Sequence, residues 1–345
     1  MTDRIVIKAS LNPIYQTIQP TLFPQTGHAT YKDPKSGRDC LIVESPQSMS
    51  NRLEELVLKP NSPNLELLPL FNGLPYVVLF DKTFNKIVAS TVTLPHRIGT
   101  GYIAKHKESE LGKQLIPEIN RNGLHLTLFK YDPLSLIHGV FLSHLASSKN
   151  KKNQVTLDGD KSKVTRALTG RIEASNVVVV PVGGASKDPI SASSNKWQLK
   201  GYFEGAEAQT KGSSLGMGNL PYYQEEYACE TITATFTIDR YLLETYGLPE
   251  PAKNLLVAIA QWKVLKFLDS PIRLRTSEYD VVEIDKSGLE ADLSDLEKHI
   301  PKLIEQCTKE GLFADPTVTE VAITLKEKEK SQPKTAKKTK QEVDK

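Results

Sequence analysis

The pattern of hydrophobic and polar residues predicts strands in several parts of the chain. Alternating apolar and polar side chains indicate a half-buried strand, because successive side chains of a strand point to opposite faces of its sheet. This alternation is found at 14–22 (IYQTIQPTL) and 231–239 (TITATFTID). A β-branched run predicts a strand within 171–182, and pairs of short apolar runs predict a hairpin at 74–92 and a strand pair at 272–284.

The clearest start of a helix lies at Ser45 and Pro46, directly after a short apolar strand that begins at Cys40. Serine caps free N–H groups at the start of a helix, and proline suits its first turn. These residues predict a helix over 45–58. Asp132 and Pro133 repeat the signal and predict a second helix over 134–146.

Two further helices are predicted by their apolar residues. The segment 252–268 is apolar almost all round, as a buried helix is, and 293–310 is amphipathic. Helices and strands are intermingled without the regular alternation of a doubly wound sheet, so the predicted fold class is α+β.

Two segments depart from this regular pattern. From 183 to 221, glycine, serine, alanine, lysine and asparagine replace the apolar periodicity. A segment of this length without regular structure is usually functional or disordered, and we interpret it as an arm. From 326 to 345 there are eight lysines, four acidic residues and few apolar side chains. This composition predicts a disordered tail.

Charge and composition restrict the function without determining it. The 345 residues include 44 basic and 41 acidic side chains, and without the tail the two charges nearly balance. A neutral body excludes nucleic-acid binding over the whole surface and leaves room for one local basic groove. The three cysteines lie far apart and form no zinc-binding pair, so we expect neither metal nor cofactor. With no apolar stretch long enough for a signal peptide or a membrane span, the protein is expected to be cytoplasmic and soluble.

Enzymatic chemistry is suggested only weakly. The string GSSLG at 212–216 matches the nucleophile pattern of serine hydrolases, with Ser214 as the nucleophile. That motif requires a strand before the serine and a helix after it, and neither is predicted here. His138 and His144 lie six residues apart, which is not the spacing that places two metal ligands on one helix face.

The helix predicted at 45–58 has the polar end that an anion-binding site needs. Met49, Leu53, Leu56 and Val57 share one face, and Gln47, Asn51 and Glu54 share the opposite one. Free N–H groups at the start of the helix can bind a sugar-phosphate backbone, together with Ser45, Gln47, Ser48, Asn51 and Arg52. The alternative is an ordinary capped surface helix.

Arginines recur in pairs elsewhere, as Arg166 and Arg171 and as Arg273 and Arg275. Arg273 and Arg275 lie two apart in a predicted strand, and so point to the same face. Such a pair can bind phosphates or form ion pairs with acids. Aromatic residues near the arm, including Tyr222 and Tyr223, can stack on bases or anchor the arm to its own core.

Five strings of the chain together resemble one family. They occur in the order ESPQSMSNRLE, YDPLSLIHGVFL, RALTGRIEASNV, GMGNLPYYQEEYACE and WKVLKFLDSPIRLRT, and span most of the chain, roughly from Tyr15 to Asp280. They resemble the CRISPR-associated backbone subunit of the type I-G (formerly I-U) interference complex, a member of the RAMP superfamily.

This resemblance implies a modified RRM or ferredoxin-like palm over 1–325, with insertions that include a thumb-like hairpin at about 183–223. It implies that several copies polymerise along one CRISPR RNA, with other subunits of the complex, and that guide pairing finds the target DNA. The residues that inherit a guide-binding role are Ser45, Gln47, Ser48, Asn51, Arg52, Arg166, Arg171, Arg273 and Arg275. No motif here matches the loop aspartate with which related type III subunits cut RNA, so no nuclease activity is expected. The alternatives are a protein-binding adaptor and a hydrolase that uses Ser214.

Overall fold

The computed structural model describes residues 3–20, 22–23, 27–142, 162–188, 200–204, 206–207, 210–274 and 277–324. The chain forms two compact units, each built from segments that are separated in the sequence. The first comprises Met1–Leu53, Leu168–Asp239 and Gln261–Leu293. The second comprises Glu54–Ala167, Arg240–Ala260 and Ser294–Lys345.

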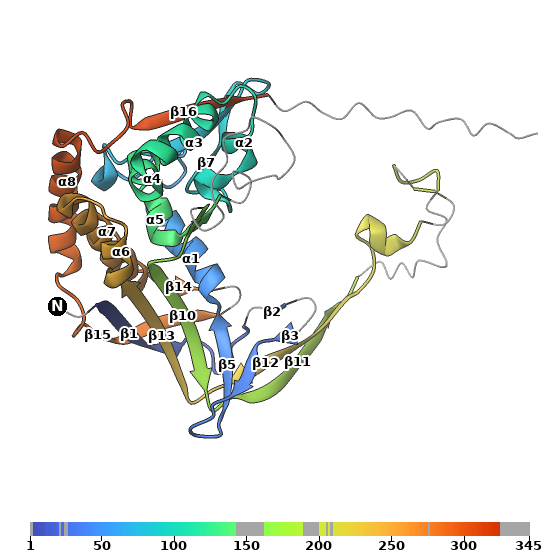
Figure 1. The fold of residues 1–345 in the computed structure, drawn as a ribbon. Helices are drawn as coiled ribbons and strands as arrows, with labels where there is room; N and C mark the ends of the chain where they lie inside the picture. Colours follow the sequence, from blue (N-terminus) through green and yellow to red (C-terminus); the bar gives the residue numbers. More distant parts are fainter. Residues whose placement is uncertain are drawn as a thin grey trace, which may run out of the picture. The chain divides into compact units, whose positions relative to one another are not determined.

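A curled seven-stranded sheet forms the first unit (Figure 1). Each strand is antiparallel to its neighbours, in the order β14-β15-β1-β13-β10-β5-β4. The strands are β1 (Arg4–Pro13), β4 (Thr30–Lys32), β5 (Asp39–Glu44), β10 (Leu168–Ser175), β13 (Thr231–Asp239), β14 (Ile272–Arg273) and β15 (Glu278–Asp285). The strands predicted at 231–239 and 272–284 are therefore confirmed, and so is the α+β class.

The strand predicted at 14–22 is wrong. The long N-terminal strand is β1, in which the alternate residues Ile5, Ile7, Ala9 and Leu11 are buried. Residues after Pro13 bend instead, and Ile18 makes only a single bridge to Tyr227. Instead of a regular ladder of backbone bonds, two side-chain hydrogen bonds hold this segment. Thr17 donates to Glu226 (2.5 Å), and Gln19 donates to Gln224 (2.8 Å).

Two helices pack on one face of the sheet, namely α1 (Pro46–Glu55) and α7 (Glu250–Leu268). Gly170 of β10 lies opposite Phe236 of β13, and a Cβ atom at this glycine would lie 2.4 Å from the Phe236 ring and 3.0 Å from Met49 of α1. Glycine is needed here because sheet and helix approach so closely. Phe236 also packs edge-on against Phe267 of α7, with ring centroids 5.9 Å apart.

The order of elements along the chain gives the sheet a recognisable topology. Strands β1, β10, β13 and β15 follow one another with α1 before β10 and α7 before β15. In the sheet they stand in the order β15-β1-β13-β10. This is the fourth-first-third-second order of a β-α-β-β-α-β arrangement, to which β4, β5 and β14 are added.

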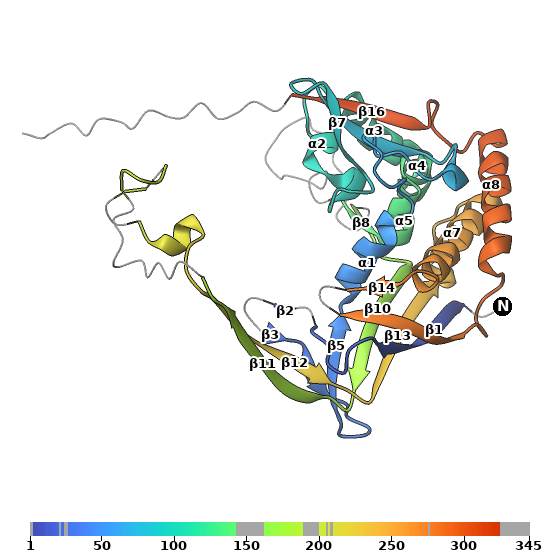
Figure 2. The same cartoon turned by 180° about the vertical axis from the view of Figure 1, so that it is seen from behind.

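A two-stranded ribbon, β11 (Val178–Ser186) paired with β12 (Leu220–Ala228), leaves the sheet between β10 and β13. Figures 1 and 2 show that it extends away from the seven-stranded sheet. The segment 171–182 is thus divided between two strands, because the chain turns at Asn176, which has a positive φ of 52°. The arm is longer than the predicted 183–221, because its two strands begin at Val178 and end at Ala228. A ribbon that is largely exposed does not need apolar periodicity, so the sequence pattern did not reveal its full length.

The second unit contains a three-stranded sheet in the order β16-β6-β7, with β16 (Val318–Ile323), β6 (Tyr76–Asp81) and β7 (Lys86–Ser90). The hairpin predicted at 74–92 is confirmed by the antiparallel pairing of β6 and β7. The helix predicted at 293–310 is α8 (Leu293–Lys309). The unit also includes the pair β8 (Val140–Phe141) and β9 (Lys163–Val164), with the helices α2 (Gly101–Ala104), α3 (Glu110–Asn122), α4 (Leu124–Tyr131), α5 (Leu134–His138) and α6 (Arg240–Thr245).

The helix predicted over 134–146 is much shorter in the structure. α5 ends at His138 because Gly139 adopts a positive φ of 78°, and the chain then enters β8. A side chain at Gly139 would lie 2.9 Å from the carbonyl of Val164, so this turn requires glycine. His144 lies outside the described residues.

Candidate nucleic-acid interface

The start of α1 is built by the capping signal that the sequence contains. The N–H of Ser48 donates to the Ser45 hydroxyl (3.3 Å), and the N–H of Met49 donates to the Ser45 carbonyl (2.9 Å). Pro46, which has no N–H to satisfy, occupies the first helical position. The predicted cap and strand-to-helix junction are therefore confirmed, although α1 ends at Glu55 rather than at residue 58.

The two faces of α1 differ strongly in exposure. Met49 and Leu53 are fully buried, whereas Gln47 and Asn51 are exposed one helical turn apart. The Gln47 amide lies 3.5 Å from the Asn51 side-chain oxygen. Gln47 in the first turn of α1 and Asn51 in the second thus present two exposed amide side chains on one face of the helix.

Glu54 does not belong to this exposed face, contrary to the helical-wheel prediction. Its side chain is only 9% exposed and forms an ion pair with Arg97, which also donates to the carbonyl of Gly139 (2.7 Å). Nδ1 of His138 lies 3.6 Å from the same carboxylate. A buried carboxylate is stable only with such partners, and a helical wheel drawn for one helix cannot reveal them.

Arg52 is held by two partners within the first unit. Its Nε atom lies 2.8 Å from Oε1 of Glu44, whose side chain is 2% exposed, and its Nη1 donates to the carbonyl of Arg273 (3.1 Å). The side chain of Arg52 is one-third exposed. Arg52 thus joins α1 to β5 and β14, and it brings the backbone of Arg273 close to the helix.

The other predicted arginines occupy different surroundings. Arg273 extends into solvent with its side chain 76% exposed, 3.3 Å from Glu278. Arg171 is on the sheet face opposite the helices and pairs with Glu173 at 2.8 Å. Arg275 lies outside the described residues. Arg273 therefore lies beside Arg52 in the last turn of α1, whereas Arg171 is on another face of the same unit.

Arg166 belongs to the second unit, although only five residues separate it from Arg171. Burial lowers the pKa of its guanidinium, and the nearby charge of Arg97 lowers that pKa further while Glu54 opposes this effect. Arg166 is thus part of the surroundings of the buried Glu54–Arg97 pair. The sequence spacing of Arg166 and Arg171 did not reveal that a unit boundary lies between them.

Asp132 is a buried acid in the same unit. Complete burial raises the pKa of its carboxyl from 3.8 to about 6, although a hydrogen bond from Ser135 and the charge of Arg97 oppose the rise. Its carboxylate accepts a hydrogen bond from the Ser135 hydroxyl at the start of α5. The sequence pattern identified Asp132 as a helix-start residue but gave no indication of its burial.

Replacing Asp132 by asparagine should increase stability above pH 6. The pKa of Asp132 is higher in the folded than in the unfolded chain, so protonation of its carboxyl favours folding. The stability that protonated Asp132 contributes is complete below about pH 4 and is lost as the pH rises through about 6. A rise of about two units corresponds to roughly 3 kcal/mol. Urea unfolding from about pH 4 to 8 should therefore show that the free energy of unfolding of Asp132→Asn, relative to that of the natural protein, increases with pH. Equal stability of the two proteins at about pH 8 would contradict this assignment.

Ser214 lies in surroundings that differ from those of a hydrolase nucleophile. It belongs to a short 3-10 turn (Gly212–Leu215), and its hydroxyl donates to the Lys211 carbonyl (2.7 Å). The turn is followed by strand β12 after Gly216, whereas the nucleophile motif places a helix after the serine. The expected strand-turn-helix context is thus not present around Ser214.

The ribbon presents two exposed aromatic rings. Tyr222 and Tyr223 are 55% and 73% exposed, and they stand opposite Gly184 and Gly183 of the partner strand. A Cβ atom at Gly184 would lie 2.8 Å from the Tyr222 ring, so this ring lies close against the backbone of the glycine. Because adjacent residues of a strand point to opposite faces, the ribbon presents one tyrosine on each face. Such rings are suitable for stacking on bases.

Other kinds of site are less well supported in the described part of the chain. Among these residues, no group of three or more histidine, cysteine or acidic side chains could hold a metal ion. No helix among them combines the length and the apolar character needed to cross a membrane.

The comparisons with solved structures found distant similarities only. The chain is similar to a CRISPR RNA-guided surveillance complex, pre-nicking, with 10% identity over 76% of this chain and 69% of that one and a TM-score of 0.33. It is also similar to Csc2 of Thermofilum pendens, with 8% identity over 90% and 78% of the two chains and a TM-score of 0.29. Such TM-scores are too low to establish a shared fold. No curated protein matches the sequence.

A family model gives the stronger result. Residues 5–179 match the model described as CRISPR-associated protein GSU0053. The matched segment makes up half of the chain and contains most of β1 and all of β5, α1 and β10. The chain therefore belongs to the GSU0053 family of CRISPR-associated proteins.

Proposed function

We propose that the protein is a non-catalytic subunit that binds CRISPR RNA and polymerises along it in a type I-G interference complex. The observation that carries the proposal is the exposed face of α1, where the amide side chains of Gln47 and Asn51 lie within the matched family segment. In this role the subunit contacts further copies of itself and other subunits of the complex. It reaches target DNA through the pairing of the guide.

The physical reason is the kind of ligand that this helix face suits. Amide side chains such as Gln47 and Asn51 can bond to phosphate or sugar without selecting a base. Arg52, in the last turn of α1, and the exposed Arg273 add guanidinium groups near this surface, and each is also paired with an acidic side chain. A subunit that accepts any guide must bind backbone and shape, and it leaves sequence reading to base pairing.

The fold and the arm support the same role. The β15-β1-β13-β10 order is the one expected of a ferredoxin-like palm, and we propose a single palm over 1–325 that carries the other segments as insertions. The thumb proposed at about 183–223 corresponds to the ribbon and its far end, where Tyr222 and Tyr223 offer stacking surfaces on both faces. Ser45, Ser48, Arg166, Arg171 and Arg275 remain proposed RNA contacts.

Replacing Gln47 and Asn51 together by alanine tests the proposal. Two hydrogen bonds to phosphate or sugar would be lost, each contributing about 1 kcal/mol, so RNA affinity should fall by about tenfold or more. Stability should stay within about 0.5 kcal/mol because both side chains are exposed. The measurement is filter binding of repeat-spacer RNA at one fixed salt concentration.

A matched control removes exposed polar side chains from another helix, for example Lys298 and Gln306 of α8. The control should keep the RNA affinity of the natural protein. Equal affinity of the Gln47→Ala/Asn51→Ala variant and the natural protein would count against the interface at α1. Arg52 is unsuitable for this test because its bonds to Glu44 and to the Arg273 carbonyl also hold the fold.

A further inference from the structure

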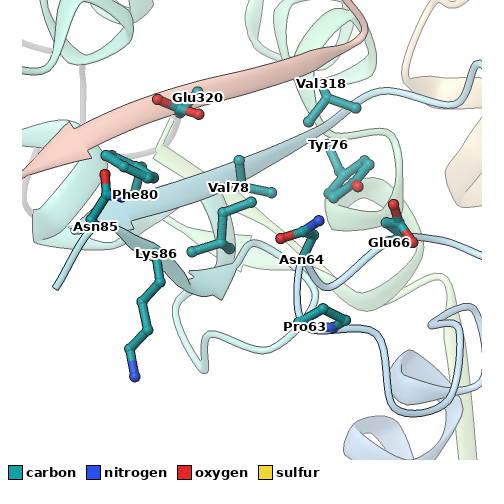
Figure 3. Close-up of a pocket in the computed structure, with 11 residues that line it drawn as sticks. Pro63, Asn64, Glu66, Tyr76, Val78, Phe80, Asn85, Lys86, Val318 and Glu320 are labelled. Atoms are coloured by element: carbon teal, nitrogen blue, oxygen red, sulfur yellow. The ribbon is translucent and has the colours of Figure 1, made fainter. Parts of the chain in front are cut away.

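A cavity of about 530 Å³ lies on one face of the three-stranded sheet in the second unit (Figure 3). Side chains of β6 that alternate along the strand, Tyr76, Val78 and Phe80, form its apolar floor. Val318 of β16 and the loop that carries Asn64 form its walls. The volume and the apolar lining with a few polar groups are typical of a ligand site.

The cavity continues into a second hollow of about 330 Å³ on the same unit. The two share Glu66, Tyr76 and Val318, and the second hollow is also lined by Asn72 and Gly73. Together they form a groove rather than a closed pocket. A groove suits an extended segment of chain with one side chain inserted, because both ends remain open to the rest of the segment.

Polar side chains without internal partners surround the cavity. The carboxylate of Glu320 and the side-chain amides of Asn64 and Asn85 make no hydrogen bond or ion pair within the part of the chain that the structure describes. Figure 3 shows Asn85 beside the ring of Phe80 and Asn64 toward the other end of the cavity, and Glu320 stands opposite Val78 in the pairing of β16 with β6. A bound ligand can therefore meet a carboxylate, an amide and an aromatic ring at one end of the cavity.

The charge inside the cavity is negative. Lys86 extends away from the cavity in Figure 3, and its ammonium lies 5.7 Å from the centre of the Phe84 ring. Glu66 is bonded through Oε2 to Lys59 (3.5 Å) and Ser62 (3.1 Å). Burial raises the pKa of Tyr76, and the negative charge of Glu66 raises it further. The unpaired carboxylate of Glu320 makes the cavity unfavourable for phosphate and favourable for a cation.

We propose that this groove binds an arginine side chain carried by an extended segment of a partner protein. A planar guanidinium can donate two parallel hydrogen bonds to the Glu320 carboxylate while its face lies on the Phe80 ring. The remaining N–H groups can donate to the side-chain oxygen of Asn85. Apolar residues next to the arginine would cover Val318 and Val78. The proposal is independent of RNA binding, since it uses neither α1 nor the ribbon.

The test is an NMR titration of the full-length protein with the peptide acetyl-Val-Arg-Val-amide. The methyl resonances of Val78, Ile87 and Val318, which line the cavity, should shift and saturate. The same peptide with citrulline in place of arginine keeps the shape but loses the charge, and it should bind about tenfold more weakly. Glu320→Gln should weaken binding of the arginine peptide by a similar factor, whereas Glu305→Gln on the exposed face of α8 should leave it unchanged.

Three results would overturn the proposal. One is the absence of saturable shifts at the cavity methyl groups with the arginine peptide. Another is equal binding of the citrulline peptide, which would reduce the site to a non-specific apolar groove. The third is an unchanged affinity in Glu320→Gln. Since Glu320 is exposed and makes no bond within the described residues, its replacement should leave the fold intact, which the spectrum of the free variant will establish.

Discussion

Replacement of Arg97 by leucine is expected to destabilise the second unit by about 3–5 kcal/mol, because it removes Arg97 from its ion pair with the buried Glu54 carboxylate. The side chains of Arg97 and Glu54 are 10% and 9% exposed, so water cannot replace the lost partner. The Arg97 backbone also has a positive φ of 48°, which the surrounding contacts must hold in place. Chemical denaturation followed by a probe in the second unit measures the effect.

Two variants separate the loss of the ion pair from the loss of an arginine as such. Arg121→Leu removes an exposed arginine at the end of α3 and should change stability by less than about 0.5 kcal/mol. Arg97→Leu/Glu54→Leu removes both charges and should recover much of the lost stability, as replacing buried pairs by apolar residues often does. A loss below about 1 kcal/mol in Arg97→Leu would show that the Glu54–Arg97 ion pair contributes little to the stability of the second unit.

The second large effect is expected from Tyr222→Ala/Tyr223→Ala on the ribbon. If each ring stacks on a base, each contributes about 1–3 kcal/mol, so the double variant should weaken RNA binding in the assembled particle by at least tenfold. Stability of the free protein should change little, because both rings are largely exposed. Tyr222→Phe/Tyr223→Phe keeps the rings and should retain binding.

The matched control for the ribbon is Tyr241→Ala, which removes another exposed tyrosine (66%) at the start of α6. Affinity of the assembled particle for RNA can be compared across the four proteins at one salt concentration. Unchanged affinity in the double alanine variant would assign the two rings to protein contacts of the arm. A loss in the phenylalanine variant as well would point to the hydroxyl groups rather than to stacking.

Local signals in the sequence predicted local structure well. The cap at Ser45 and Pro46 located the start of α1, because capping involves only the first turn of a helix. The alternation at 231–239 located β13, since one face of that strand is buried and the other is not. The apolar segment at 252–268 was correctly predicted as a helix, which is buried over nearly its whole length.

Features that depend on distant partners were not predictable. Glu54 was placed on the exposed face of α1, because nothing in one helix reveals that Arg97 lies against it. The strand β12 was missed because an exposed ribbon carries no apolar alternation, and its tyrosines cover glycines of the other strand. For the candidate interface, the sequence identified Arg52 and Arg273, but only the structure joins the Arg52 guanidinium to the Arg273 carbonyl.

The central claim is that this chain assembles on CRISPR RNA, and RNA sequencing of the purified protein tests it most directly. The chain would be expressed alone, with a CRISPR array, and with the array and the other subunits of its complex. We predict a large particle enriched in repeat-spacer RNA whenever the array and the partner subunits are present. A protein that remains small and free of nucleic acid in all three conditions would contradict the claim.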